Sequence, residues 1–164
     1  MFLEQIINLV LSYFKIFLLL VTSIIILSTL FNLRRQNIKS ADSRFLLSSF
    51  FLTLFLVLIF EVKPHHLLRT SCGVSNLITY LFYFILVSIF FIKHIKLILR
   101  FRFALIIISY SFFGIANAVD LLSDGRLIVF DDSELFEDIF HIIGIFFWLL
   151  FFADYSKRIK TKYL

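Results

Sequence analysis

The sequence predicts an all-α integral membrane protein, a polytopic helical bundle with five transmembrane helices in a single domain over residues 1–164. Hydrophobic residues make up 61% of the chain and the mean hydropathy is +1.01, both far above the values of soluble proteins. The single proline leaves almost every helical hydrogen bond available in lipid, where water cannot replace it. Most of the charged residues stand between long apolar runs, as in loops that join membrane-spanning helices.

Five apolar segments approach the roughly 20 residues that a helix needs to cross a hydrocarbon core of about 30 Å. The first covers about 12–33, and residues 2–11 either lie at the membrane interface or extend this helix. Lys15 stands near its start, where we expect the side chain to extend toward the headgroups. No cleaved leader is expected, because Glu4 occurs where a signal peptide has basic residues.

The other four predicted spans cover about 45–62, 74–92, 103–122 and 135–154. The second span carries no charge before Glu61, and the fourth carries none before Asp120. The last span opens with the letters LFED, after which its apolar stretch continues to Ala153. Each segment therefore has the length and composition of a transmembrane helix.

The basic residues predict the orientation of these spans. Twelve of the sixteen lie in segments 34–44 and 93–102 and in the tail 157–162, which five crossings bring to one side. The positive-inside rule makes that side cytoplasmic, with the N-terminus outside and the C-terminus inside. We expect this basic inner face to contact anionic lipid headgroups rather than nucleic acid. Its main residues are Arg34, Arg35, Lys93, Lys96, Arg100, Lys157 and Arg158.

The stretch from residue 116 to residue 144 holds seven of the eleven carboxylates, although apolar runs flank it on both sides. Asp131 is placed to cap the last helix, and Glu134 stands at the capping-box position three residues later. Carboxylates in a first turn also stabilise the helix dipole by about 0.3–1 kcal/mol each. Capping and the dipole explain several of these residues, and solvated loop charges are the alternative reading for most of them.

Spacing along the last two helices predicts a polar pocket at the outer membrane boundary. Residues three, four and seven apart share a helix face. Ionisable groups held at membrane depth usually mark a functional site, because an unpaired charge in lipid is costly. We expect Asp120 and His141 to be the deepest members of the pocket. Its candidate residues are Asn117, Asp120, Glu134, Glu137, Asp138 and His141.

A metal site is not expected, and neither is a cofactor. His65 and His66 follow Pro64 and suggest ligands that would join His141, but adjacent loop histidines rarely bind one ion together. The chain contains no GxSxG elbow, P-loop or HExxH motif, so no catalytic residue is assigned.

Two glycines interrupt the phenylalanine-rich helices. Small residues let helix backbones approach closely in lipid. We therefore expect Gly114 and Gly144 to form a packing contact between the fourth and fifth spans.

Residues 110–158 contain the runs NAVDLLSD and FDDSELFEDIFHIIGIFFWLLFFADYSKR. They weakly resemble the N-terminal membrane input regions of bacterial diguanylate cyclases and sensor histidine kinases. The matching positions are Asp120, Glu137, Asp138, Gly144 and the basic exit at Lys157 and Arg158. The resemblance implies a sensory module. Since residues 1–164 contain no sequence like a cyclase or kinase output domain, we expect that the module either signals through a membrane or cytoplasmic protein partner or no longer signals.

Three functional hypotheses follow. The first is a binding, sensory or interaction module with an outer pocket of acidic residues and histidine. The second is a structural subunit of a larger membrane complex. The third is a membrane enzyme or transporter that uses a proton or metal site. The frequent Phe, Ile and Lys residues and the lack of sorting signals favour a bacterial inner membrane.

Overall fold

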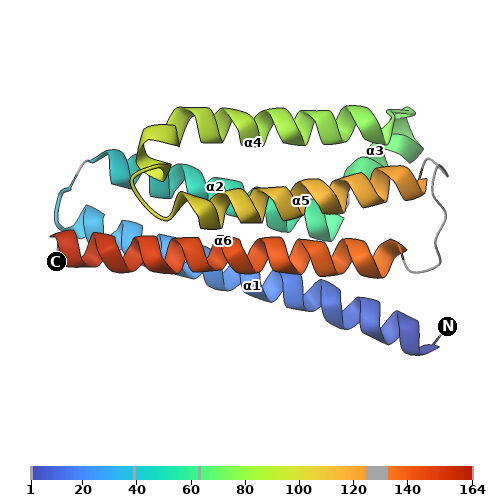
Figure 1. The fold of residues 1–164 in the computed structure, drawn as a ribbon, viewed down its shortest axis with the longest axis horizontal. Helices are drawn as coiled ribbons and strands as arrows, with labels where there is room; N and C mark the ends of the chain where they lie inside the picture. Colours follow the sequence, from blue (N-terminus) through green and yellow to red (C-terminus); the bar gives the residue numbers. More distant parts are fainter. Residues whose placement is uncertain (1, 39, 63, 125–132, 164) are drawn as a thin grey trace.

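The computed structural model describes residues 2–38, 40–62, 64–124 and 133–163. These residues form six helices and no strand (Figure 1). All of them except α3 are long and apolar enough to cross a membrane, which confirms the predicted all-α class with five spans. The helices are α1 (Phe2–Arg35), α2 (Ala41–Val62), α3 (Pro64–Cys72), α4 (Asn76–Ile98), α5 (Phe103–Asp124) and α6 (Ser133–Tyr163).

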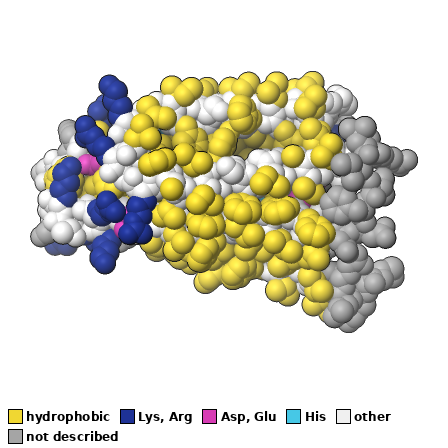
Figure 2. Space-filling view, viewed as in Figure 1, with side chains coloured by type: hydrophobic (Ala, Val, Ile, Leu, Met, Phe, Trp, Pro, Cys, Tyr) yellow, Lys and Arg dark blue, Asp and Glu magenta, His cyan; other side chains and the backbone are white. Residues whose placement is uncertain are grey.

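The helix α6 is the centre of the bundle. It packs along α1 on one side and α5 on the other, and α1 also packs against α2 (Figure 1). The helix α4 lies along the outside of this group, with sparser contacts to α2 and α5. We call the end that holds the N-terminus, α3 and the start of α6 the acidic end. The opposite end, where Lys and Arg side chains gather, is the basic end (Figure 2).

The structure selects one of the two alternatives for residues 2–11 and differs from the sequence prediction at residues 64–72. The helix α1 begins at Phe2, so residues 2–11 extend the first span rather than form a separate interfacial segment. Residues 64–72, expected to be a loop, form α3. Proline is well tolerated at the first position of a helix, where its missing N–H has no partner to lose, and Pro64 occupies that position. Gly73, with φ of 66°, then ends the helix.

Hydrogen bonds fix both the end of α1 and the start of α2. Asn37 adopts φ of 56°, and its N–H donates to the Arg34 carbonyl at 2.9 Å. The N–H of Ile38 donates to the Leu33 carbonyl at 3.0 Å, which completes a Schellman motif at the end of α1. The hydroxyl of Ser40 then accepts from the N–H of Ser43 at 3.2 Å and caps the start of α2.

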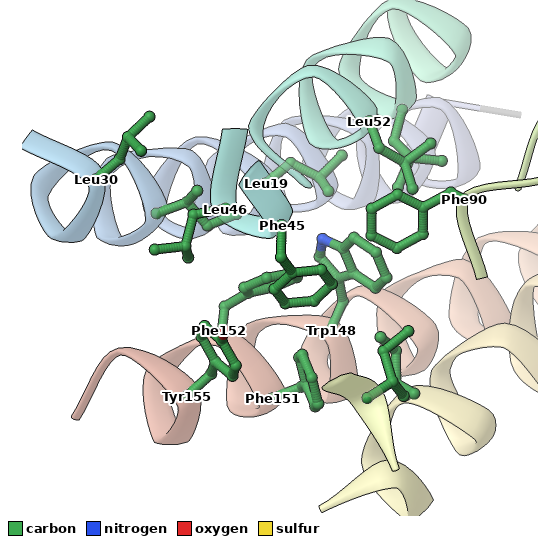
Figure 3. Close-up of a cluster of buried hydrophobic side chains, with 14 of the residues drawn as sticks. Leu19, Leu30, Phe45, Leu46, Leu52, Phe90, Trp148, Phe151, Phe152 and Tyr155 are labelled. Atoms are coloured by element: carbon green, nitrogen blue, oxygen red, sulfur yellow. The ribbon is translucent and has the colours of Figure 1, made fainter. Parts of the chain in front are cut away.

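Aromatic side chains fill the core toward the basic end. Phe45 of α2 is fully buried, and its ring centroid lies 5.1–6.3 Å from those of Phe90, Phe151, Phe152 and Tyr155 (Figure 3). Such ring pairs add about 0.5–1.5 kcal/mol each to the burial of their area.

Two hydrogen-bonded contacts tie α6 to α2. The indole N–H of Trp148 donates to Thr53 Oγ1 at 3.0 Å, within the buried core. At the basic end, Asp42 accepts from the hydroxyls of Tyr155 at 2.7 Å and Tyr163 at 2.9 Å. Lys162 Nζ lies 3.4 Å from the same carboxylate. The far end of α6 is therefore held against the first turn of α2.

The two glycines of α5 and α6 have different surroundings. Gly144 is buried, and Ser109 Oγ of α5 donates to its carbonyl at 2.7 Å. Gly114 is exposed, and a Cβ atom there would meet nothing within 4 Å. Only Gly144 stands at the close contact, so the expectation that Gly114 also packs against the last helix is wrong.

Replacing Gly144 with alanine should lower the stability of the bundle by about 1–3 kcal/mol. The new methyl group would lie 2.9 Å from Phe113 Cε1 and 3.1 Å from the Ser109 carbonyl oxygen. Gly114→Ala adds the same group in open space and is the matched control, with stability unchanged or slightly raised. Thermal unfolding in detergent measures both variants. Equal melting temperatures would contradict a packing role for Gly144.

Candidate functional site

The first turns of α6 carry three of the predicted site residues on one face. Oxygen or nitrogen atoms of Glu137, Asp138 and His141 all lie within 4.8 Å of one another. His141 Nδ1 is 3.6 Å from Glu137 Oε1, and the His141 side chain is only 5% exposed. The helical spacing that motivated the prediction therefore does bring these groups together.

Lys15 of α1 completes this group. Its ammonium forms a direct ion pair with Asp138, and the two side chains are only 5% and 17% exposed. The ammonium also lies 5.5 Å from the centre of the Phe60 ring of α2, within cation–π range. We call Lys15, Glu137, Asp138 and His141 the buried ion cluster.

The expectation that Lys15 extends toward the headgroups is wrong. Because α1 begins at Phe2, Lys15 lies thirteen residues, or about 20 Å, from the start of the helix. The Asp138 carboxylate is within direct reach, and it compensates the charge that water would otherwise have to solvate. The ion pair therefore takes the place of an extended side chain.

Glu134 lies at the edge of the same group. Its carboxylate accepts from Asn8 Nδ2 of α1 at 3.4 Å, and this contact is exposed. The sequence interpretation paired the last span with the fourth and did not include α1. Asn8 and Lys15 are seven residues apart and therefore lie on one face of α1. A search of the first span for polar residues at this helical spacing would have identified them. Asp131, the predicted helix cap, lies outside the described residues.

The other two predicted residues belong to α5. The carboxylate of Asp120 accepts a hydrogen bond from the hydroxyl of Tyr80, which is on α4. Asn117 lines a cavity together with Tyr80 and His141. Asp120 therefore links α5 to α4 at the acidic end, a contact that the sequence interpretation missed.

The cavity has a volume of about 310 Å³ and lies between α2, α4, α5 and α6. This volume is at the lower end of the range for small-molecule sites. Its lining along α4 extends from Leu77 to Phe91, a distance of about 21 Å along the helix. Most of the wall is aliphatic or aromatic, with a few polar side chains: Tyr80, Tyr83, Ser109, Tyr110, Asn117 and His141.

Tyr83 contributes a buried hydroxyl to this wall. The residue is 8% exposed, and among the described residues its buried hydroxyl has no hydrogen-bond partner. A buried hydroxyl without a partner costs roughly 1–3 kcal/mol, so a group inside the cavity that accepts a hydrogen bond from it would remove this cost.

The cavity is open on the side of α4 and α5. Gly114 and Ala118 line it from α5, and both are exposed. Leu77, Leu81 and Phe84 line it from α4 and are 56–59% exposed. Because Gly114 and Ala118 are small and one turn apart, they leave a gap between the two helices that faces the surroundings of the bundle.

The buried ion cluster has the donor types that a divalent cation accepts, two carboxylates and an imidazole. However, the Lys15 ammonium already supplies a positive charge at Asp138. His65 and His66, the other histidines that suggested metal ligands, lie on α3, and their side chains are outside the described part of the structure.

Residues 8–155 match the model of a family described as Domain of unknown function (DUF8692). No curated protein and no solved structure matches the chain.

Removing the charge of Lys15 alone should destabilise the protein by about 3–5 kcal/mol, since Lys15→Met leaves Asp138 uncompensated inside the bundle. The double variant Lys15→Met/Asp138→Leu should recover most of this loss. Arg102→Met is the control, because that guanidinium is 65% exposed and 3.7 Å from Asp154, and its loss should cost less than about 1 kcal/mol. Denaturant unfolding in micelles measures all three. Equal losses in the single and double variants would contradict the coupling.

Proposed function

Since the chain belongs to the family described as Domain of unknown function (DUF8692), its function has to be argued from its own residues, and we propose that it is a membrane-embedded binding module. The site is the cavity between α2, α4, α5 and α6. The ligand is a slender, mostly apolar molecule with one polar group that accepts a hydrogen bond. The observation that carries the proposal is the buried Tyr83 hydroxyl, which has no hydrogen-bond partner among the described residues and lines a mostly apolar cavity.

The shape of the cavity supports a chain-like ligand. Its length of about 21 Å along α4 exceeds half of a hydrocarbon core of about 30 Å, while its volume is modest. A single hydrocarbon chain has this form, whereas a compact polar metabolite does not. The gap at Gly114 and Ala118 gives such a molecule a lateral route from the lipid.

His141 supports a link between the cavity and the rest of the bundle. It lines the cavity and also lies beside Glu137 in the buried ion cluster. A ligand that touches the imidazole would change the surroundings of the Lys15–Asp138 pair, which joins α1 to α6. This contact would give the module a sensory response, as the resemblance to membrane input regions implies.

For location, we propose a bacterial inner membrane with the basic end in the cytoplasm. Twelve of the sixteen basic residues lie in segments that end there, and the positive-inside rule relates such a bias to the cytoplasmic side. A protein partner that receives a signal would then bind at the basic end.

Ligand binding can be measured with Trp148, the only tryptophan, because it lines the cavity and is 3% exposed. A bromine-tagged long-chain alcohol should quench its fluorescence. Tyr83→Phe should weaken binding about 2–10-fold, since it removes one hydrogen bond. Gly114→Phe should abolish quenching by blocking the gap.

Ile115→Phe is the matched control, because Ile115 neighbours Gly114 but is not part of the cavity lining. It should bind the alcohol as the parent does. Absence of quenching in the parent, or full quenching in Gly114→Phe, would refute the proposed site and favour a structural subunit.

The orientation is tested with Cys72, the only cysteine, which is exposed at the acidic end. A membrane-impermeant maleimide should label it in intact cells. In Cys72→Ser/Gln36→Cys, the new thiol lies at the basic end and should react only after permeabilisation. The opposite pattern would reverse the proposed orientation.

A further inference from the structure

A second cavity lies at the basic end, at the turn between α1 and α2. Its volume is about 610 Å³. It is lined by Arg34, Asn37, Ile38, Ser40, Ser43, Arg44 and Leu47. The Schellman motif fixes the end of α1 and the Ser40 cap fixes the start of α2, so the lining side chains come from two defined helix ends.

Two arginines from different helices face this cavity. Arg34 is in the last turn of α1 and Arg44 is in the first turns of α2. Among the described residues, neither guanidinium has a carboxylate within ion-pair distance. Two like charges beside one hollow repel each other, and an anion between them would offset this repulsion.

The nearest carboxylate in the sequence is already engaged. Asp42 accepts hydrogen bonds from Tyr155 and Tyr163 and is 3.4 Å from Lys162 Nζ. These contacts hold Asp42 against α6, and it is not part of the cavity lining. Two other arginines at this end do have a carboxylate partner: Asp154 lies 3.1 Å from Arg158 and 3.7 Å from Arg102.

The remaining lining suits a phosphate group. A guanidinium offers paired N–H donors in the geometry of phosphate oxygens. The hydroxyls of Ser40 and Ser43 and the Asn37 amide add neutral polar groups, and the start of α2 carries the positive end of its dipole. Ile38 and Leu47 supply apolar wall beside these polar groups.

We propose that this cavity binds a phosphate anion, and that its source is the headgroup of an anionic phospholipid. Two candidate spans, Ile6–Arg35 and Ala41–Phe60, meet at this turn, so the arginines stand where a membrane-spanning helix reaches the headgroup layer. The apolar part of the wall then borders the beginning of an acyl chain. The inference is independent of the ligand proposed for the first cavity.

The test is native mass spectrometry of the purified full chain with added phosphatidylglycerol or phosphatidylcholine. The parent should retain phosphatidylglycerol preferentially, and Arg34→Gln/Arg44→Gln should bind it at least about tenfold more weakly. Lys96→Gln/Arg100→Gln removes the same charge from exposed residues at the same end that do not line the cavity. This control should lose much less binding than the arginine variant, because its residues meet headgroups only as part of the exposed basic inner face.

Inorganic phosphate distinguishes the two sources. It should neither displace phosphatidylglycerol nor raise the melting temperature of the parent. Stabilisation by inorganic phosphate that is lost in Arg34→Gln/Arg44→Gln would overturn the lipid as the source. Equal binding of phosphatidylglycerol by the two double variants would overturn the site. Melting temperatures without anionic lipid show that the arginine variant is folded, since both residues are exposed.

Discussion

The ion pair between Lys15 and Asp138 constrains how α1 and α6 pack together at the acidic end. Two charges removed from water must meet in one geometry, because either charge without the other is costly in an apolar interior. This requirement sets the rotation and the axial position of α1 against α6. Apolar contacts between the same helices are not directional and would tolerate a shift. The Phe60 ring over the ammonium extends the constraint to α2.

A second polar contact constrains the opposite end. Asp42 holds the last turns of α6 through Tyr155 and Tyr163, so α6 is fixed at both ends against partners far away in the chain. Between these points the core consists of rings packed edge to face or stacked around Phe45. The helix α4 has no comparable ion pair among the described contacts, and the first cavity lies along it.

The amino-acid composition and the spacing of residues along the chain were sufficient to predict the fold class and the five spans. A helix that crosses lipid needs a long apolar run and little else. The spacing also brought Glu137, Asp138 and His141 together, because all three lie on one helix whose geometry is known in advance. The role of Lys15 was not predictable in the same way. Which helix faces α6 depends on packing between distant segments, and the pattern of one span does not contain that information.

The same limit applies to α5. Asp120 was expected beside His141, but the hydroxyl that donates to its carboxylate belongs to Tyr80 of α4, forty residues earlier in the chain. Gly114 and Gly144 look alike in sequence, yet one lines an open cavity and the other touches Ser109 and Phe113. Small residues allow close approach of helices without specifying where it occurs. The third helix, α3, was missed because its nine residues are too short and too polar to resemble a span.

The lengths of the helices also determine how the protein meets bilayers of different thickness. With 22 or 23 residues, α2, α4 and α5 are about 33–35 Å long, close to a hydrocarbon core of about 30 Å. With 34 and 31 residues, α1 and α6 are about 51 and 46 Å long. The three shorter helices therefore set the preferred hydrophobic thickness. In a thicker or thinner membrane, the mismatch would be absorbed by tilt, while the long pair continues to extend beyond the hydrocarbon core.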